Sequence, residues 1–171
     1  MTLGEPVNRT LHTLALLGAL AALSVPSLAG TPGGNYCVGA PNSTGLGASM
    51  GSSGSNSVSQ ADFTLVVSSL PANSFGVFYY GGGAVQAPFG NGFRCVGEGT
   101  TGIFRLKAVC DVDPVGVATL PLDFGRKPVG SGPGTITAGS TWFFQFLYRD
   151  GRLPATAGFN LSDGYEQTFA P

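Results

Sequence analysis

Short stretches of alternating apolar and polar residues, each ended by glycine or proline, dominate this chain from residue 62 onward. The 171 residues include 28 glycines and 12 prolines, and glycine far exceeds its average usage of about 7%. Both residues interrupt helices, and strands with turns at intervals of about ten residues are typical of β-sandwiches. The sequence therefore predicts an all-β protein of eight or nine strands with no helix.

The most β-prone segment is TWFFQFLYRD, residues 141–150. Its even-numbered positions form an aromatic stripe of Trp142, Phe144, Phe146 and Tyr148, because side chains alternate between the two faces of a strand. The odd-numbered positions form a mixed face that is also largely apolar. Both faces should therefore be covered, as in a central strand.

The remaining strands follow the same alternation. We expect them at 36–38, within 39–60, and at 62–68, 75–80, 93–96, 103–110, 117–124 and 159–169, with turns at 71–74, 88–92 and 162–164. The strands 62–68 and 75–80 should pair as an antiparallel hairpin, and Asn91-Gly92 should supply a positive φ. Pro121 favours an edge strand, and the Gly/Pro-rich segment 125–139 is long enough to cross between sheets. These features predict an antiparallel β-sandwich with Greek-key or jelly-roll connections.

The N-terminal 29 residues have the pattern of a signal peptide. A largely apolar run of thirteen residues at 13–25 follows a polar segment that contains Arg9 and His12, and Ser27-Leu28-Ala29 provides small residues for cleavage after Ala29. The run is short for a membrane span, although an uncleaved anchor or a buried helix is the alternative. We expect a signal peptide at 1–29, a flexible lead-in at 30–34 and one domain at 35–171.

Cleavage after Ala29 would remove His12, the only histidine. A mature chain without histidine cannot build the Ser-His-Asp or Cys-His arrangements of nucleophilic catalysis. The net charge of −1 gives no surplus to attract nucleic acid or anionic lipid. We therefore expect no enzyme, no cofactor, no nucleic-acid partner and no membrane insertion after cleavage.

Three cysteines, Cys37, Cys95 and Cys110, allow at most one internal disulfide. Their spacing matches no metal or redox motif, and a structural bridge is the expected use in an exported protein. The spacing does not identify the pair. The third thiol would be buried, or would pair with another chain.

Several acidic and polar residues have a functional interpretation beside a structural one. Asp111 and Asp113 form a DxD pattern that could bind calcium together with Asp150 or Asp163, but solvated turn residues are the preferred interpretation. Arg149 and Asp150 should form a surface ion pair at the end of the aromatic strand. The glycosylation sequons at 42–44 and 160–162 are interpreted as turns.

Aromatic side chains are the other candidate site. Tyr79, Tyr80 and Trp142 could stack on sugar rings if they are exposed. Aromatic residues at strand spacing usually belong to the core, and that interpretation is favoured for Tyr80 and Trp142.

A resemblance adds to these observations. Tyr36-Cys37, GNGFRCVG at 90–97, GSTWFFQFLYRD at 139–150 and FNLSDG at 159–164 together resemble a domain found near the C-termini of secreted and surface proteins of planctomycete-like and myxobacteria-like bacteria. The resemblance implies a secreted β-domain and favours a disulfide between Cys37 and Cys95, with Cys95–Cys110 as the alternative pairing. It brings no known activity.

The sequence thus predicts a secreted, non-catalytic surface or envelope protein with a structural, attachment or assembly role. Its partners would be cell-envelope components or polysaccharide. The first alternative is a carbohydrate-binding module that uses Tyr79, Tyr80 and Trp142. The second is a self-assembling subunit that pairs through Cys110 or through exposed edge strands.

Overall fold

The computed structural model describes residues 1–2, 31–106, 109–151 and 157–171. These residues form twelve β-strands in antiparallel sheets, without a helix, so the predicted all-β sandwich is confirmed. The predicted number of eight or nine strands is wrong, because two of the expected strands are divided and β5 was not expected. Among them, no helix is present that has the length and hydropathy needed to cross a membrane. The expected signal peptide lies almost entirely outside the described residues.

The larger sheet has β10 at its centre. Its order is β1 (Gly34–Tyr36), β12 (Gly164–Thr168), β10 (Thr141–Arg149), β4 (Phe75–Gly81) and β7 (Ile103–Arg105), with β11 (Phe159–Leu161) also beside β10 and β8 (Cys110–Asp111) also beside β4. The prediction of a central strand at 141–150 is confirmed. The first strand is displaced from its predicted position at 36–38, because Cys37 has a φ of 62° and ends it.

A three-stranded sheet packs on one face of this larger sheet. It consists of β2 (Ser49–Ser53), β3 (Thr64–Ser68) and β9 (Ala118–Pro121), in that order. Leu65 and Val67 of β3 are fully buried in one core with the aromatic stripe of β10. Pro121 lies on an edge strand as predicted, and the segment 125–139 crosses from this sheet to the larger one.

The predicted hairpin between 62–68 and 75–80 is wrong. Strand β3 pairs with β2 and β9, whereas β4 pairs with β10, β7 and β8 in the other sheet. The connection carries the chain across the core, and its Leu70 is 2% exposed. Two strands whose apolar faces meet across a core have the same alternation as two neighbours in one sheet, so the pattern could not separate the two arrangements.

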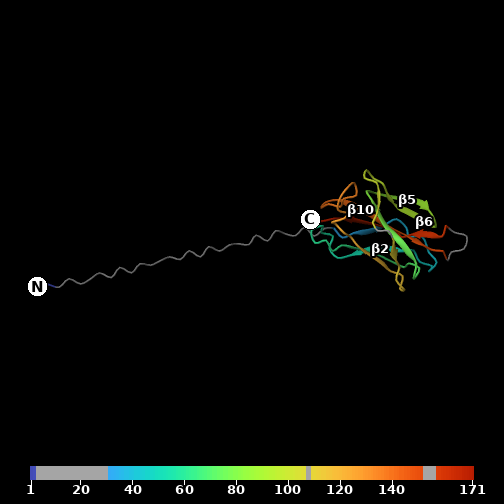
Figure 1. The fold of residues 1–171 in the computed structure, drawn as a ribbon, viewed down its shortest axis with the longest axis horizontal. Coiled ribbons are helices and arrows are strands. Elements are labelled where there is room, and N and C mark those ends of the chain that lie inside the picture. Colours follow the sequence, from blue (N-terminus) through green and yellow to red (C-terminus); the bar gives the residue numbers. More distant parts are fainter. Residues whose placement is uncertain (3–30, 107–108, 152–156) are drawn as a thin grey trace.

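A two-stranded hairpin forms a third layer on the outer face of the larger sheet (Figure 1). Strand β5 (Gly83–Phe89), which the sequence did not predict, pairs with β6 (Gly92–Gly97). The turn was expected at 88–92, and its positive φ of 60° falls on Gly90 rather than on Asn91-Gly92. Cys95 and Val96 of β6 are fully buried.

The turn predicted at 162–164 is wrong, because the chain continues along the same side of β10. Leu147 pairs with Leu161, whereas Phe144 pairs with Tyr165. The chain thus takes four residue steps from Leu161 to Tyr165, whereas β10 takes three from Leu147 to Phe144. One extra residue on one strand of a pair is the pattern of a β-bulge. This bulge splits the expected strand 159–169 into β11 and β12. The expected strand 103–110 is likewise divided into β7 and β8, with residues 107 and 108 outside the described part.

Candidate functional site

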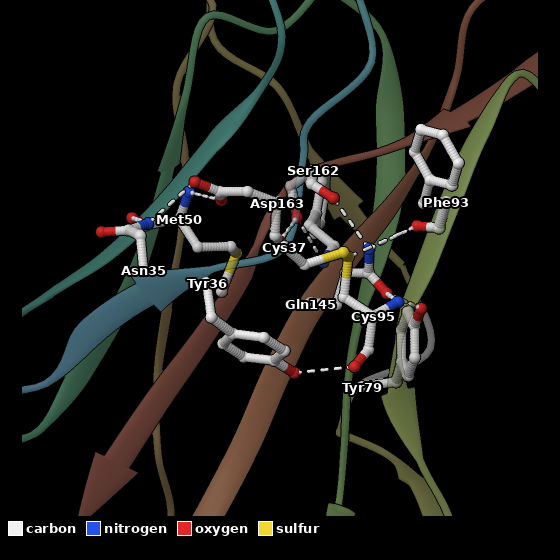
Figure 2. The surroundings of a disulfide bond; sticks show 11 residues. Asn35, Tyr36, Cys37, Met50, Tyr79, Phe93, Cys95, Gln145, Ser162 and Asp163 are labelled. Atoms are coloured by element: carbon white, nitrogen blue, oxygen red, sulfur yellow. Dashed lines mark hydrogen bonds between the residues drawn. A yellow bond between two sulfur atoms is a disulfide. The ribbon is translucent and has the colours of Figure 1, made fainter. Parts of the chain in front are cut away.

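Gln145 is the centre of a buried polar cluster on the outer face of β10. Its side chain is fully buried, and its Oε1 accepts hydrogen bonds from the Tyr79 hydroxyl and from the backbone N–H of Cys95. Its Nε2 donates to the carbonyls of Phe93 at 2.8 Å and Ser162 at 2.7 Å. A side-chain amide has two acceptor sites and two N–H donors. Gln145 therefore uses its full capacity to connect the β5–β6 hairpin, the central strand and the bulge (Figure 2).

A disulfide between Cys37 and Cys95 lies next to Gln145 (Figure 2). It joins the residue that follows β1 to the middle of β6, across 58 residues of sequence. The Tyr36 hydroxyl donates to the Cys95 carbonyl at 2.8 Å, which fixes the same two segments a second time. The pairing that the resemblance favoured is confirmed. Cys110 lies outside the bridge and is 6% exposed.

Asp163, in the bulge, bridges the two sheets of the sandwich. Its carboxylate accepts from the backbone N–H of Met50 at 2.7 Å, the Ser49 hydroxyl at 3.1 Å and Asn35 Nδ2 at 2.9 Å. Asn35 Nδ2 also donates to the Met50 carbonyl at 2.6 Å. The side chains of Asp163 and Asn35 thus bond the backbone N–H and carbonyl of Met50 at the outer edge of β2, as a neighbouring strand would. Partial burial raises the pKa of Asp163 above its usual value, and the bonds from Met50, Ser49 and Asn35 offset only part of that rise.

We call Cys37, Cys95, Gln145, Ser162 and Asp163 the bulge joint. The bulge determines the geometry of the bulge joint. At the bulge, the Phe146 N–H donates to the Ser162 hydroxyl and not to a backbone carbonyl of the neighbouring strand. Burial also raises the pKa of the adjacent Tyr36 and Tyr79 well above the ordinary value, so both remain neutral donors at physiological pH.

The aromatic candidates fall in different environments. Tyr80 is fully buried and Trp142 is 5% exposed, and their rings contact each other with centroids 5.0 Å apart. Both belong to the core, which is the interpretation favoured for them. Tyr79 is half-buried on the outer face, with its hydroxyl on Gln145. The three side chains therefore do not form one exposed platform.

The acidic candidates do not converge on one point. Among the described residues, no group of three or more His, Cys, Asp or Glu side chains is placed to hold a metal. Asp113 instead accepts from the N–H groups of Val115 and Val117 in its own loop, and Asp163 belongs to the bulge joint. These contacts support the turn interpretation for Asp113 and a sheet-bridging role for Asp163.

The expected Arg149–Asp150 surface ion pair is wrong. Asp150 is 1% exposed and its Oδ2 accepts from the Ser43 N–H at 3.0 Å, whereas the Arg149 side chain is exposed. Adjacent residues of a strand point to opposite faces, which separates the two. The sequon residues are buried as well, with Asn42 3% and Asn160 0% exposed. Asn42 Oδ1 accepts from the Thr44 N–H at 2.8 Å, as in a local turn. The turn expected at 160–162 is wrong, because Asn160 and Leu161 belong to β11.

Sequence reasoning missed Gln145 and Asn35. A glutamine between phenylalanines in a central strand is a detectable signal, because a buried amide needs partners on neighbouring elements. Asn35 is the first residue of the expected domain, directly after the expected lead-in at 30–34, and no pattern marks it there.

The chain matches no protein-family model, no curated protein and no solved structure. The fold and the bulge joint therefore carry the functional argument.

Proposed function

We propose that the protein is an extracytoplasmic, non-catalytic module with a structural or attachment role at the cell surface. The observation that carries this proposal is the saturation of the bulge joint. Gln145 has no remaining donor or acceptor, and Asp163 is bonded by three side-chain or backbone donors. A cluster in this state stabilises a fold and does not offer a nucleophile or a proton carrier to a substrate.

Two further observations support the proposal. A disulfide that connects separate layers is typical of proteins that leave the reducing cytosol. Several of the described aspartates accept hydrogen bonds from backbone N–H groups, as Asp62 does from Ser55 and Asp123 from Gly125. Such carboxylates are committed to local structure. The resemblance to domains of secreted and surface proteins agrees with this role.

The test is to express the full-length gene in a bacterial host, to fractionate the cells, and to sequence the N-terminus of the exported protein. We expect recovery outside the cytoplasm with processing after Ala29. The exported protein is then incubated with insoluble polysaccharides and native cell-envelope fractions, with calcium and with chelator. Retention on the envelope or on one polysaccharide supports attachment. Cytoplasmic retention, with Cys37 and Cys95 reduced, would overturn the proposal.

A further inference from the structure

A cleft opens at the seam between the two sheets, next to the bulge joint. It has a volume of about 360 Å³ and is lined by Pro32, Gly33, Ser52, Gly54, Ser55, Asn56, Phe63, Tyr165 and Gln167. This volume is at the lower end of the range of about 300–1,000 Å³ for small-molecule sites. The cleft is separate from the aromatic candidates of the sequence, since none of Tyr79, Tyr80 and Trp142 lines it.

The cleft lies where the edge of β2 is no longer covered. The Asp163 carboxylate accepts from the backbone N–H of Met50, and Asn35 donates to the Met50 carbonyl. Both bonds lie on the side of β2 that faces away from β3. Backbone groups of alternate residues point in the same direction along a strand. Ser52, two residues further on, therefore directs its backbone N–H and carbonyl toward the seam. The edge of β2 thus adds a main-chain donor and acceptor to the cleft.

The polar side chains of the cleft are held in place by contacts with the protein. The hydroxyls of Tyr165 and Ser52 are 2.7 Å apart, and the Tyr165 hydroxyl donates to Gln167 Oε1 at 3.4 Å. Asn56 Nδ2 donates to the carbonyls of Thr31 and Thr168, each at 3.2 Å. These bonds orient the groups before any ligand arrives, which lowers the entropic cost of binding. Ser52 and Asn56 are partly exposed, and the Ser52 hydroxyl and the Asn56 Oδ1 retain lone pairs for a ligand O–H, whereas the Tyr165 hydroxyl orients Ser52 from beneath.

The chemistry of the lining indicates the class of ligand. All nine residues are uncharged, and the polar ones offer hydroxyls and amides. Phe63 is 1% and Tyr165 is 6% exposed, so their rings are covered by the protein, and contacts with a ligand would be made by the hydroxyl and amide groups. Asp62, whose carboxylate accepts from the Ser55 N–H at the rim, would disfavour an anion. From this combination we infer that the cleft binds one unit of a neutral saccharide, and this inference rests on the proposed attachment role.

The test is calorimetric titration of the full-length exported protein with cellobiose, maltose, chitobiose and glucuronic acid. We expect one of the neutral disaccharides to bind and glucuronic acid not to bind. Ser52→Val places two methyl groups in the cleft and removes the hydroxyl, and should weaken binding by about tenfold or more. Tyr165→Phe keeps the ring and should weaken binding by about fivefold, the loss of the one hydrogen bond that orients Ser52.

The matched control is Ser53→Val, because Ser53 is exposed on the same strand and points to the opposite face. It should bind the disaccharide as the unmodified protein does. Circular dichroism and the thermal midpoint of each variant verify folding. Equal binding by Ser52→Val, Tyr165→Phe and Ser53→Val would overturn the inference. Envelope retention without binding of any of the sugars would also overturn it while leaving the attachment role standing, whereas loss of both retention and sugar binding would contradict both proposals.

Discussion

At the scale of single residues, the hydrogen bonds of one buried and one partly buried polar side chain, Gln145 and Asp163, explain how this sandwich is held together. Gln145 belongs to no catalytic or metal motif of the sequence, and the sequence suggests Asp163 only as an additional ligand to a calcium site at Asp111 and Asp113. Their importance comes from their partners, because each bonds groups of at least two elements that are distant in sequence. An unpaired buried polar group costs about 1–3 kcal/mol, so these residues act through the groups that they satisfy.

The first prediction concerns Gln145. Gln145→Leu keeps a similar volume but leaves the Cys95 N–H and the carbonyls of Phe93 and Ser162 without this partner. We expect the free energy of unfolding to fall by about 3 kcal/mol or more, measured by urea denaturation. Gln86→Leu, on the exposed side of β5, is the control and should change it by less than about 0.5 kcal/mol. Equal effects of the two substitutions would contradict the role of Gln145.

The second prediction concerns the pH dependence that Asp163 confers. Partial burial raises its pKa in the folded state above the ordinary 3.8, so between these two values the native protein binds more protons than the unfolded chain. The contribution of Asp163 to the free energy of unfolding should therefore decrease as the pH rises from 3.8 through the raised pKa, and then become constant.

The measurement is the difference in the free energy of unfolding between the unmodified protein and Asp163→Asn, from about pH 3 to pH 7. Asparagine does not titrate, so the difference isolates this group. A difference that grows as the pH rises would mean that the hydrogen bonds to Asp163 outweigh its burial.

At the scale of elements, the bulge between β11 and β12 divides one long strand, and its residues contact all three layers of the molecule. The extra residue interrupts the regular ladder with β10, and Ser162 supplies its hydroxyl to the Phe146 N–H instead. The same irregularity places Asp163 against β2 of the opposite sheet. On the other side of β10, the disulfide and Gln145 fix the β5–β6 hairpin. The hairpin is thus bound by specific contacts in addition to its apolar surface.

The third prediction concerns that hairpin. Replacing both Cys37 and Cys95 with serine opens a loop closed across 58 residues, for which chain entropy predicts a loss of about 4 kcal/mol. Urea denaturation measures the loss. Hydrogen exchange should show this loss in both β3 and β6, with a further loss in β6, because the bridge also holds β6 against local opening and does not contact β3. Uniform loss of protection in both strands would contradict a local role for the disulfide.

At the scale of the whole molecule, the three layers determine which groups meet solvent. The core between the two sheets contains the aromatic stripe of β10, and the hairpin covers the opposite face of the same strand. Cys110 belongs to the core cluster, so pairing with another chain through this residue would require the sandwich to open. The exposed strand edges are the remaining route to the self-association that the sequence suggested.

The fourth prediction follows from this arrangement. The native, unreduced protein should show no thiol that reacts rapidly with a thiol-specific reagent, because Cys37 and Cys95 are bridged and Cys110 is 6% exposed. Denaturation without reductant should expose one thiol per chain. Light scattering should give the same mass with and without reductant. A dimer that dissociates on reduction would show that Cys110 pairs between chains.

The sequence by itself determined the all-β class, the central position of 141–150, the edge position of Pro121 and the turn at 88–92. These features depend on local alternation, and on the limited backbone angles of proline and glycine. Tertiary structure alone decided that β3 and β4 lie in different sheets and that residues 162–163 form a bulge. It also brought Gln145, the disulfide and Asp163 together, and it opened the uncharged cleft beside Ser52. The physical reason is that alternation records only which face of a strand is apolar, whereas pairing partners, bulges and polar clusters depend on contacts between residues far apart in the chain.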